Sequence, residues 1–263
     1  MRWILSIICV LLVMITSLPG YAQTITEKQL QEAEIIAEKA IFAGRNGDFS
    51  QAETYWTQLI EEFPSNPAVW SNRGNIRVVA GNIEGAIADY NQAIFLAPNT
   101  TDPYLNRGAA LEAQGKFEEA KSDYNHILEL DPTDAMAYNN RGNAQAGQGN
   151  WEAALKDYEK AVELQPDFAF ARANVALALY EMGQKTEAIA EMKKIVRKYP
   201  MFADMRAALT AVLWEQGKQG EAESNWVATV GVDSRYQDLN WVKNIRRWPP
   251  QMVVALENFL SLK

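Results

Sequence analysis

The chain has 263 residues, enough for one or two domains, and its 33 acidic residues against 25 lysines and arginines give a formal net charge of −8. This charge, with no face rich in Lys and Arg, argues against nucleic-acid binding, because such binding needs cations to neutralise phosphates. Long stretches rich in Ala, Leu, Glu, Lys and Gln, and the absence of period-two alternation, predict an all-α protein.

The first 22 residues have the pattern of a secretory signal. An apolar run follows Arg2 and continues to about Leu18, and small residues precede a cleavage site after Ala22. The run is shorter than the roughly 20 residues of a membrane span, so an uncleaved N-terminal anchor is the alternative. The single cysteine, Cys9, lies in this run. We therefore expect an exported, disulfide-free mature chain, in a bacterial periplasm or a thylakoid lumen.

Prolines recur every 34 residues, and glycines and alanines recur at the same spacing. The members are Pro64, Pro98, Pro132, Pro166 and Pro200; Gly47, Gly81, Gly115, Gly149, Gly183 and Gly217; and Ala52, Ala86, Ala120, Ala154, Ala188 and Ala222. A period of this length is typical of helical hairpins stacked into a solenoid. We predict six repeats, residues 33–66, 67–100, 101–134, 135–168, 169–202 and 203–236, within a solenoid domain of residues 23–236.

Each recurring residue has a physical role in the predicted hairpin. The Gly lies at the turn, where the first helix must end in the left-handed backbone region. The Ala lies early in the second helix, where the two helices approach closely, and the Pro follows that helix because it cannot continue one. A large side chain four residues after each Ala is expected to fill the space between hairpins: Trp56, Tyr90, Tyr124, Tyr158, Met192 and Trp226.

The pattern is most complete in "WSNRGNIRVVAGNIEGAIADYNQAIFLAP" and "YNNRGNAQAGQGNWEAALKDYEKAVELQP". These stretches resemble the tetratricopeptide repeat family, and the resemblance covers about residues 33–236. It implies a right-handed superhelical solenoid whose concave surface, built from the first helix of each repeat, binds a peptide or a partner helix. The family's first Gly is present as Gly74, Gly108 and Gly142, and Ala40, Ala176 and Thr210 replace it in the outer repeats.

Three arginines stand where the family usually has an apolar residue, and each is followed by an aspartate sixteen residues later. The pairs are Arg73 with Asp89, Arg107 with Asp123 and Arg141 with Asp157. The outer repeats have neither member. We predict that each Arg forms an ion pair with an Asp on a facing helix, which would match its charge where desolvation is costly. The alternative is a row of solvated arginines that line a ligand groove.

The resemblance implies a partner-binding groove along the first helices. Transferred by repeat position, the candidate residues are Asn75, Leu105, Glu112, Asn139, Asn143, Phe170, Tyr180, Glu181 and Trp214. Asn139 and Asn143 are one turn apart, so both amides can face the same ligand backbone. Three of the others would form an aromatic strip for a segment with apolar anchors and some positive charge. Packing between helices is the alternative for these aromatic side chains.

Residues 237–263 follow the last repeat and form the predicted C-terminal capping helices. We place Trp241, Ile245 and Trp248 on one face of a short helix, with Arg246 and Arg247 around it. A cap over the open end of the core is the favoured interpretation, and a docking patch is the alternative. The "RRWPP" segment also resembles the end of tetratricopeptide proteins from cyanobacteria and chloroplasts, which implies a lumenal role in the assembly or maintenance of photosynthetic complexes.

We find no motif for catalysis, a cofactor or a metal; the single histidine, His126, has no nucleophile or carboxylate at a useful spacing. The sequence therefore predicts an exported, non-catalytic scaffold that binds a protein or peptide, with contact to a membrane only through a membrane-protein partner. An assembly factor that binds a precursor transiently is a second form of this function. The alternative is an accessory subunit for glycan or lipid processing, which would use the aromatic strip.

Overall fold

The computed structural model describes residues 26–261, and the predicted signal at residues 1–22 lies outside this range. The described residues form α-helices, one short 3₁₀ helix and turns, and contain no strand, which confirms the all-α prediction. None of the helices within residues 26–261 has the length and apolar character needed to cross a membrane. The chain divides into two compact units at Leu130 and Asp131.

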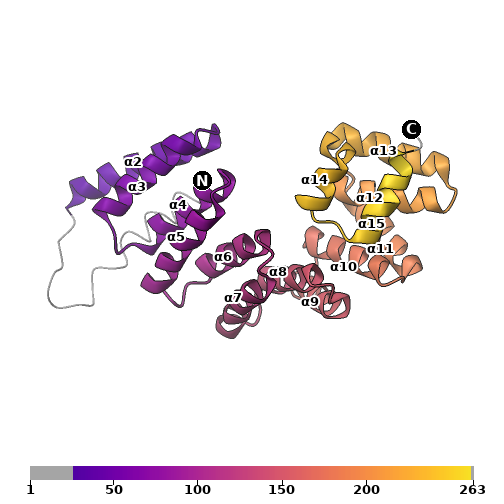
Figure 1. Ribbon diagram of the computed structural model, residues 1–263, viewed down its shortest axis with the longest axis horizontal. Coiled ribbons are helices and arrows are strands. Elements are labelled where there is room, and N and C mark those ends of the chain that lie inside the picture. The colour runs from indigo at the N-terminus through magenta and orange to yellow at the C-terminus, as the bar shows by residue number, and fades with distance from the viewer. Residues whose placement is uncertain (1–25, 262–263) are drawn as a thin grey trace. The chain divides into compact units, whose positions relative to one another are not determined.

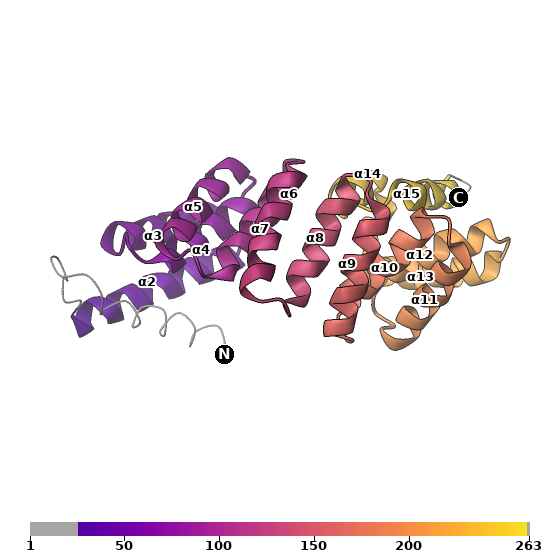
Figure 2. The same cartoon turned by 90° about the horizontal axis from the view of Figure 1, so that it is seen from below.

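Each unit contains three helical hairpins (Figures 1 and 2). In the first unit these are α2 (Glu27–Arg45) with α3 (Phe49–Glu62), α4 (Pro67–Val79) with α5 (Ile83–Leu96), and α6 (Thr101–Ala113) with α7 (Phe117–Leu130). In the second unit they are α8 (Ala135–Gly147) with α9 (Trp151–Leu164), α10 (Ala169–Glu181) with α11 (Lys185–Lys198), and α12 (Ala203–Glu215) with α13 (Gln219–Val232). The second unit ends in η1 (Ser234–Gln237), α14 (Leu239–Asn244) and α15 (Pro250–Leu260).

The periodic glycines are the turns of these hairpins, as predicted. All six have a left-handed backbone, with φ between 71° for Gly217 and 83° for Gly81. Each follows the first helix of its hairpin, and the chain then turns directly into the second helix. The first hairpin differs at its start, because α2 begins at Glu27 and not at the repeat boundary near Ala33. Thr26 caps it in a capping box with Gln29.

The large side chain of the second helix packs directly on the first helix. In the three central repeats this side chain is a Tyr, and it lies against the family's first Gly. A Cβ added to Gly108 would lie 2.6 Å from Cε1 and 2.7 Å from Cζ of Tyr124, whose side chain is fully buried. The outer repeats combine Ala40 with Trp56 and Ala176 with Met192. The Gly is therefore required where the opposing residue is Tyr.

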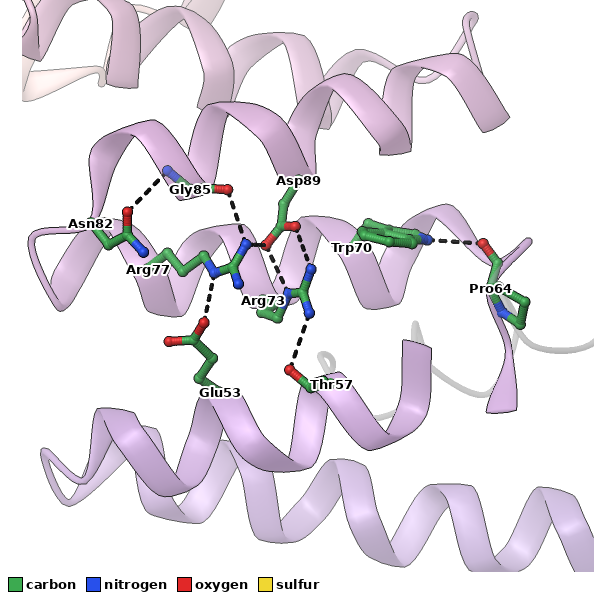
Figure 3. Close-up of polar contacts among 9 residues, drawn as sticks. All are labelled: Glu53, Thr57, Pro64, Trp70, Arg73, Arg77, Asn82, Gly85 and Asp89. Atoms are coloured by element: carbon green, nitrogen blue, oxygen red, sulfur yellow. Dashed lines mark hydrogen bonds and ion pairs between the residues drawn. The ribbon is translucent and has the colours of Figure 1, made fainter. Parts of the chain in front are cut away.

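The predicted Arg–Asp pairs are all present, each within its own hairpin. Arg107 donates from Nε and Nη2 to the carboxylate of Asp123, at 2.9 and 2.5 Å. Figure 3 shows the equivalent pair of Arg73 and Asp89, at 3.0 and 2.7 Å. Arg73 also donates to Thr57 Oγ1 at 3.1 Å, and this Thr lies on the preceding hairpin. Each Asp is almost fully buried, so the bidentate pair matches a charge that water does not reach.

A different arginine serves the fifth and sixth repeats, which the sequence pattern did not reveal. Arg172 donates to Glu191 at 2.7 Å, and Arg206 donates to Asn225 at 3.1 Å. Both acceptors lie at the repeat position that Asp holds in the central repeats. Both arginines lie one turn earlier on the first helix than the central ones. The acceptor on the second helix therefore keeps an arginine partner, although that arginine lies one turn earlier on the first helix.

Substituting Gly108 by Ala should lower the free energy of unfolding by about 1–2 kcal/mol, because the collision with Tyr124 outweighs the gain in helix propensity. Urea denaturation followed by circular dichroism measures this. Gly220 is the control, since it is exposed on α13 with no atom within 4 Å of an added Cβ. Gly220→Ala should leave the stability unchanged or raise it by up to about 1 kcal/mol. Equal losses in both variants would contradict the packing argument.

Removal of Arg107 should destabilise more than removal of the whole pair. Arg107→Leu leaves the buried carboxylate of Asp123 without its cation and should cost about 3–5 kcal/mol. The double variant Arg107→Leu/Asp123→Leu should lose clearly less, and the same urea titration compares the two. Lys160→Leu, which breaks an exposed pair with Glu163 at 2.8 Å, is the control and should cost at most about 1 kcal/mol. A double variant as unstable as the single one would refute this assignment.

Candidate functional site

The first helices of the hairpins are α2, α4 and α6 in the first unit and α8, α10 and α12 in the second. We call the side of these helices that faces away from the second helices the first-helix face. The predicted partner-binding residues all lie on these helices. The structure shows that the chain itself covers part of this face. Its C-terminal segment, Ser234–Leu260, which we call the tail, packs with α15 against α12 and α10 (Figures 1 and 2).

An aromatic cluster fixes α15 on the second unit. Phe259 is fully buried, and its ring lies 5.3 Å from the ring of Trp214 and 5.2 Å from that of Trp226, both edge to face. Leu256 and Met252, one and two turns earlier on α15, are also fully buried. Edge-to-face rings add to the free energy gained by burial of apolar area. The apolar stripe of α15 is thus the surface that covers α12.

Asp204 holds the segment before α15. Its carboxylate is buried and accepts two hydrogen bonds from Arg246, at 2.8 and 2.6 Å. The hydroxyl of Tyr236 and the indole Nε1 of Trp248 also donate to it, at 2.7 and 2.8 Å. Burial, together with the adjacent carboxylate, raises the pKa of Tyr236. Burial alone would lower the pKa of Arg246, but the charge and hydrogen bonds of Asp204 outweigh it and raise that pKa.

Glu181 caps the N-terminus of α15. Its Oε2 accepts the backbone N–H of Gln251 at 2.9 Å, and its backbone carbonyl accepts Nε2 of Gln251 at 2.8 Å. A carboxylate at this place satisfies a free N–H and interacts favourably with the helix dipole. Burial raises the pKa of Glu181, and the hydrogen bond from Gln251 opposes that rise. One of the predicted groove residues therefore binds the chain's own tail.

The predicted aromatic strip is not a continuous exposed surface. Tyr180 is buried at 1% exposure, and its hydroxyl donates to Glu215 at 2.7 Å. Trp214 is half-buried beneath Phe259. Phe170 remains open at 54% exposure and meets Phe202 edge to face. A role in glycan processing that uses these aromatics as a strip gains no support from this arrangement.

The tail also differs from its predicted form. The helix α14 ends at Asn244, so Trp241, Ile245 and Trp248 do not share one helical face. Ile245 is 66% exposed, while Trp248 is 4% exposed and bonded to Asp204. Arg247, which lies between Ile245 and Trp248, has a left-handed φ of 55°, and this turns the chain between the two residues. Trp241 stacks edge to face on Tyr236. The tail therefore covers the first-helix face of α10 and α12, and Trp248 is not available for docking.

Three asparagines form an amide cluster on α8 and α10. Asn174 donates from Nδ2 to the side-chain oxygens of Asn139 at 3.0 Å and Asn143 at 3.1 Å. The hydroxyl of Tyr158 also donates to Asn143, at 3.0 Å. Asn139 and Asn143 do share a face, as predicted, but Asn174 bonds both and was not foreseen. Met136 and Phe170, on the same two helices, are 49% and 54% exposed. Binding of a partner at these residues stays a prediction.

The candidate residues of the first unit are less uniform than predicted. Asn75 is exposed, and its Oδ1 accepts the hydroxyl of Tyr90 at 2.8 Å. Leu105 is half-buried. Glu112 is buried at 7% exposure, where its Oε1 accepts the hydroxyl of Tyr124 at 2.6 Å. Glu112 therefore supports the packing of the Tyr on Gly108 and does not present a charge to a ligand.

Within residues 26–261 no three His, Cys, Asp or Glu side chains are grouped as metal ligands. His126 stacks on Tyr104, with ring centroids 4.3 Å apart, and lies 3.2 Å from the carbonyl oxygen of Pro98. This is a packing environment between a helix and a turn.

Family models match four segments of the chain. Models described as tetratricopeptide repeat match residues 102–134, 135–168 and 174–200, and a model described as TPR repeat matches residues 74–115. No curated protein matches the chain. The matched segments lie in both units, so the repeat pattern holds across the boundary at Leu130.

Many solved structures share the fold. A MamA protein is 22% identical, with a TM-score of 0.55, over 64% of this chain and 92% of its own. YrrB, described as a TPR protein with an unusual peptide-binding site, is 18% identical, with a TM-score of 0.51, over 77% and 97%. A tetratricopeptide repeat protein from Parabacteroides merdae is 21% identical, with a TM-score of 0.65, over 88% and 86%. At these identities the likeness shows the fold alone.

Asp204→Asn should release the tail, because the neutral amide cannot balance the buried guanidinium of Arg246. Amide hydrogen exchange in residues 239–260 should become at least about tenfold faster, while exchange in α2 and α3 stays unchanged. Mass spectrometry of peptic fragments measures both. Asp167→Asn, which loses an exposed ion pair with Lys198, is the matched control and should leave the tail protected. Unchanged exchange in the Asp204 variant would show that other contacts hold the tail.

Proposed function

Because the chain belongs to the tetratricopeptide repeat family, we propose that it is a non-catalytic scaffold that binds a protein or peptide segment on its first-helix face. The observation that carries this proposal is that the same face already holds a helix in cis. On α10 and α12, Trp214 packs on Phe259 of the apolar stripe, Asp204 binds a cation, and Glu181 caps a helix N-terminus. These are the three interactions with which such a surface recognises an amphipathic helix.

The proposed partner site is the open part of this face on α8 and α10. Met136 and Phe170 offer exposed apolar area, and the amide cluster of Asn139, Asn143 and Asn174 lies on the same helices. Exposed apolar side chains beside fixed polar groups suit a segment with one or two apolar anchors and a backbone that bonds to the amides. The proposed site is therefore narrower than the full groove, since the tail covers α12 and contacts α10 at Glu181.

We further propose that the chain acts after export, in a periplasm or a thylakoid lumen. The support is the signal pattern of residues 1–22. A role in assembling membrane complexes follows from the resemblance of the tail, and contact with the membrane would then pass through a membrane-protein partner. N-terminal sequencing of the protein isolated from its host tests the export step. A chain that begins at Gln23 supports it, and a chain that retains Met1 supports the uncleaved anchor.

Photo-crosslinking tests the site. A photoreactive phenylalanine at position 170 should capture one defined protein in the native compartment, whereas the same group at Phe95, 79% exposed on the second helix α5, should not. In a second experiment the photoreactive group is placed at position 140 on α8, because position 170 is substituted. Met136→Glu/Phe170→Glu should abolish the crosslink from position 140, since both apolar anchors are lost. A product from position 95 that matches the one from position 170 would contradict the assignment to the first-helix face. A crosslinked product that is unchanged in the double variant would contradict the assignment of Met136 and Phe170 as anchors.

A further inference from the structure

The first hairpin leaves an apolar face uncovered. Ile35 and Phe42 on α2 are 52% and 69% exposed. The residues at the same two repeat positions in the later hairpins are buried or half-buried: Val69 is 5% exposed, Ala110 is 2% exposed, and Met205 and Val212 are fully buried. Those positions pack against the preceding hairpin, as α4 does against α3. The first hairpin carries large apolar side chains at the same positions, with no hairpin before it among the described residues.

This face is hollowed as well as apolar. Ile35, Lys39 and Phe42 on α2 and Tyr55 on α3 line a groove of about 670 Å³ between the two helices of the hairpin. Stacked repeats usually end in a polar capping surface, because an apolar end is poorly soluble. The groove is also lined by Glu38, Asp48 and Gln51, so this end combines Ile, Phe and Tyr with charged side chains.

Two pairs of charged residues on α2 are placed symmetrically about the centre of this face. The midpoint between Ile35 and Phe42 in the sequence lies between Glu38 and Lys39. These two residues are adjacent on the helix, so their side chains point in different directions and do not neutralise each other. Neither has an ion-pair partner within residues 26–261, whereas Glu32 has an exposed partner on its own helix, Lys28, at 3.6 Å. Ile35 and Phe42 lie at equal distances on either side of this midpoint, and so do Glu32 and Arg45.

We propose that α2 docks onto α2 of a second copy of this chain, antiparallel about a two-fold axis between Glu38 and Lys39. Ile35 then packs on Phe42 of the second copy, and Glu38 opposes Lys39. Glu32 opposes Arg45 at each end of the same contact. Every one of these contacts occurs twice, which is the property of an isologous interface. A different protein would have to offer an apolar stripe and both charges in this same order, whereas a second copy supplies them by symmetry.

Sedimentation equilibrium of the purified full chain, from about 1 µM to about 500 µM, tests the proposal. The wild type should show a monomer–dimer equilibrium, and mass spectrometry records its N-terminus. Phe42→Glu should remain monomeric throughout, because it places carboxylates in the apolar centre. Phe95→Glu is the matched control, since Phe95 on α5 is 79% exposed and Phe42 is 69% exposed, and it should dimerise as the wild type does. Circular dichroism verifies that both variants are folded.

A charge exchange separates specific pairing from general stickiness. Lys39→Glu should weaken the dimer about tenfold or more, because Glu38 then faces a carboxylate. Glu38→Lys/Lys39→Glu should restore the wild-type dissociation constant to within about threefold. A wild type that stays monomeric over the whole range would overturn the proposal, and so would a dimer that is unaffected by Phe42→Glu. A photoreactive group at position 35 that crosslinks to residues 1–25 or to another protein would identify a different occupant and also overturn it.

Discussion

A two-helix hairpin has no core of its own, so every hairpin of this chain must bury its apolar side chains against another helix. This constraint explains the sequence period and the contacts within each unit. The Tyr over Gly108 and the Arg107–Asp123 pair both act at the junction where helices meet. The first contact sets how closely two helices approach, and the second keeps a buried charge matched. Both repeat because the same junction repeats.

The same constraint explains the two places where the pattern stops. At the C-terminal end, the tail covers α10 and α12 with Phe259 and with the bonds to Asp204. At α2, the exposed Ile35 and Phe42 stand where every later hairpin is packed. One end is covered by the chain itself, and the other presents an apolar surface with symmetrically placed charges. The open part of the first-helix face, around Met136 on α8 and Phe170 near the start of α10, adjoins the tail, which contacts α10 at Glu181.

The periodic part of the fold could be predicted from the sequence. Proline, glycine and alanine at a fixed spacing identified the hairpins and their turns, and the joint presence of Arg and Asp identified the ion pairs. The shift to Arg172 and Arg206 in the last two repeats was not foreseen, because a partner one turn earlier breaks the spacing on which the prediction rested. Family resemblance alone also placed Glu112 and Tyr180 in the groove, although both side chains are buried and bonded within the units.

The position of the tail could not be predicted, because it lies outside the repeat. Trp248 and Asp204 are 44 residues apart, and no local spacing relates them. The apolar stripe of α15 indicated that the helix packs on something, but a cap over the end of the stack and a cover over the first-helix face have the same stripe. In the structure α15 does both, because Phe259 packs on Trp226 of the second helix α13 as well as on Trp214, and Glu181 of α10 caps the N-terminus of α15. The partner site that we propose is consequently confined to α8 and α10.

The central claim is that the chain uses its first-helix face to hold a helix, with its own tail as the first occupant. Amide hydrogen exchange of the unmodified chain tests this most directly, by comparing α15 with α12. The account predicts that residues 250–260 exchange as slowly as α12 and open together with it, since their side chains share one core. Rapid exchange throughout α15, with α12 still protected, would contradict it.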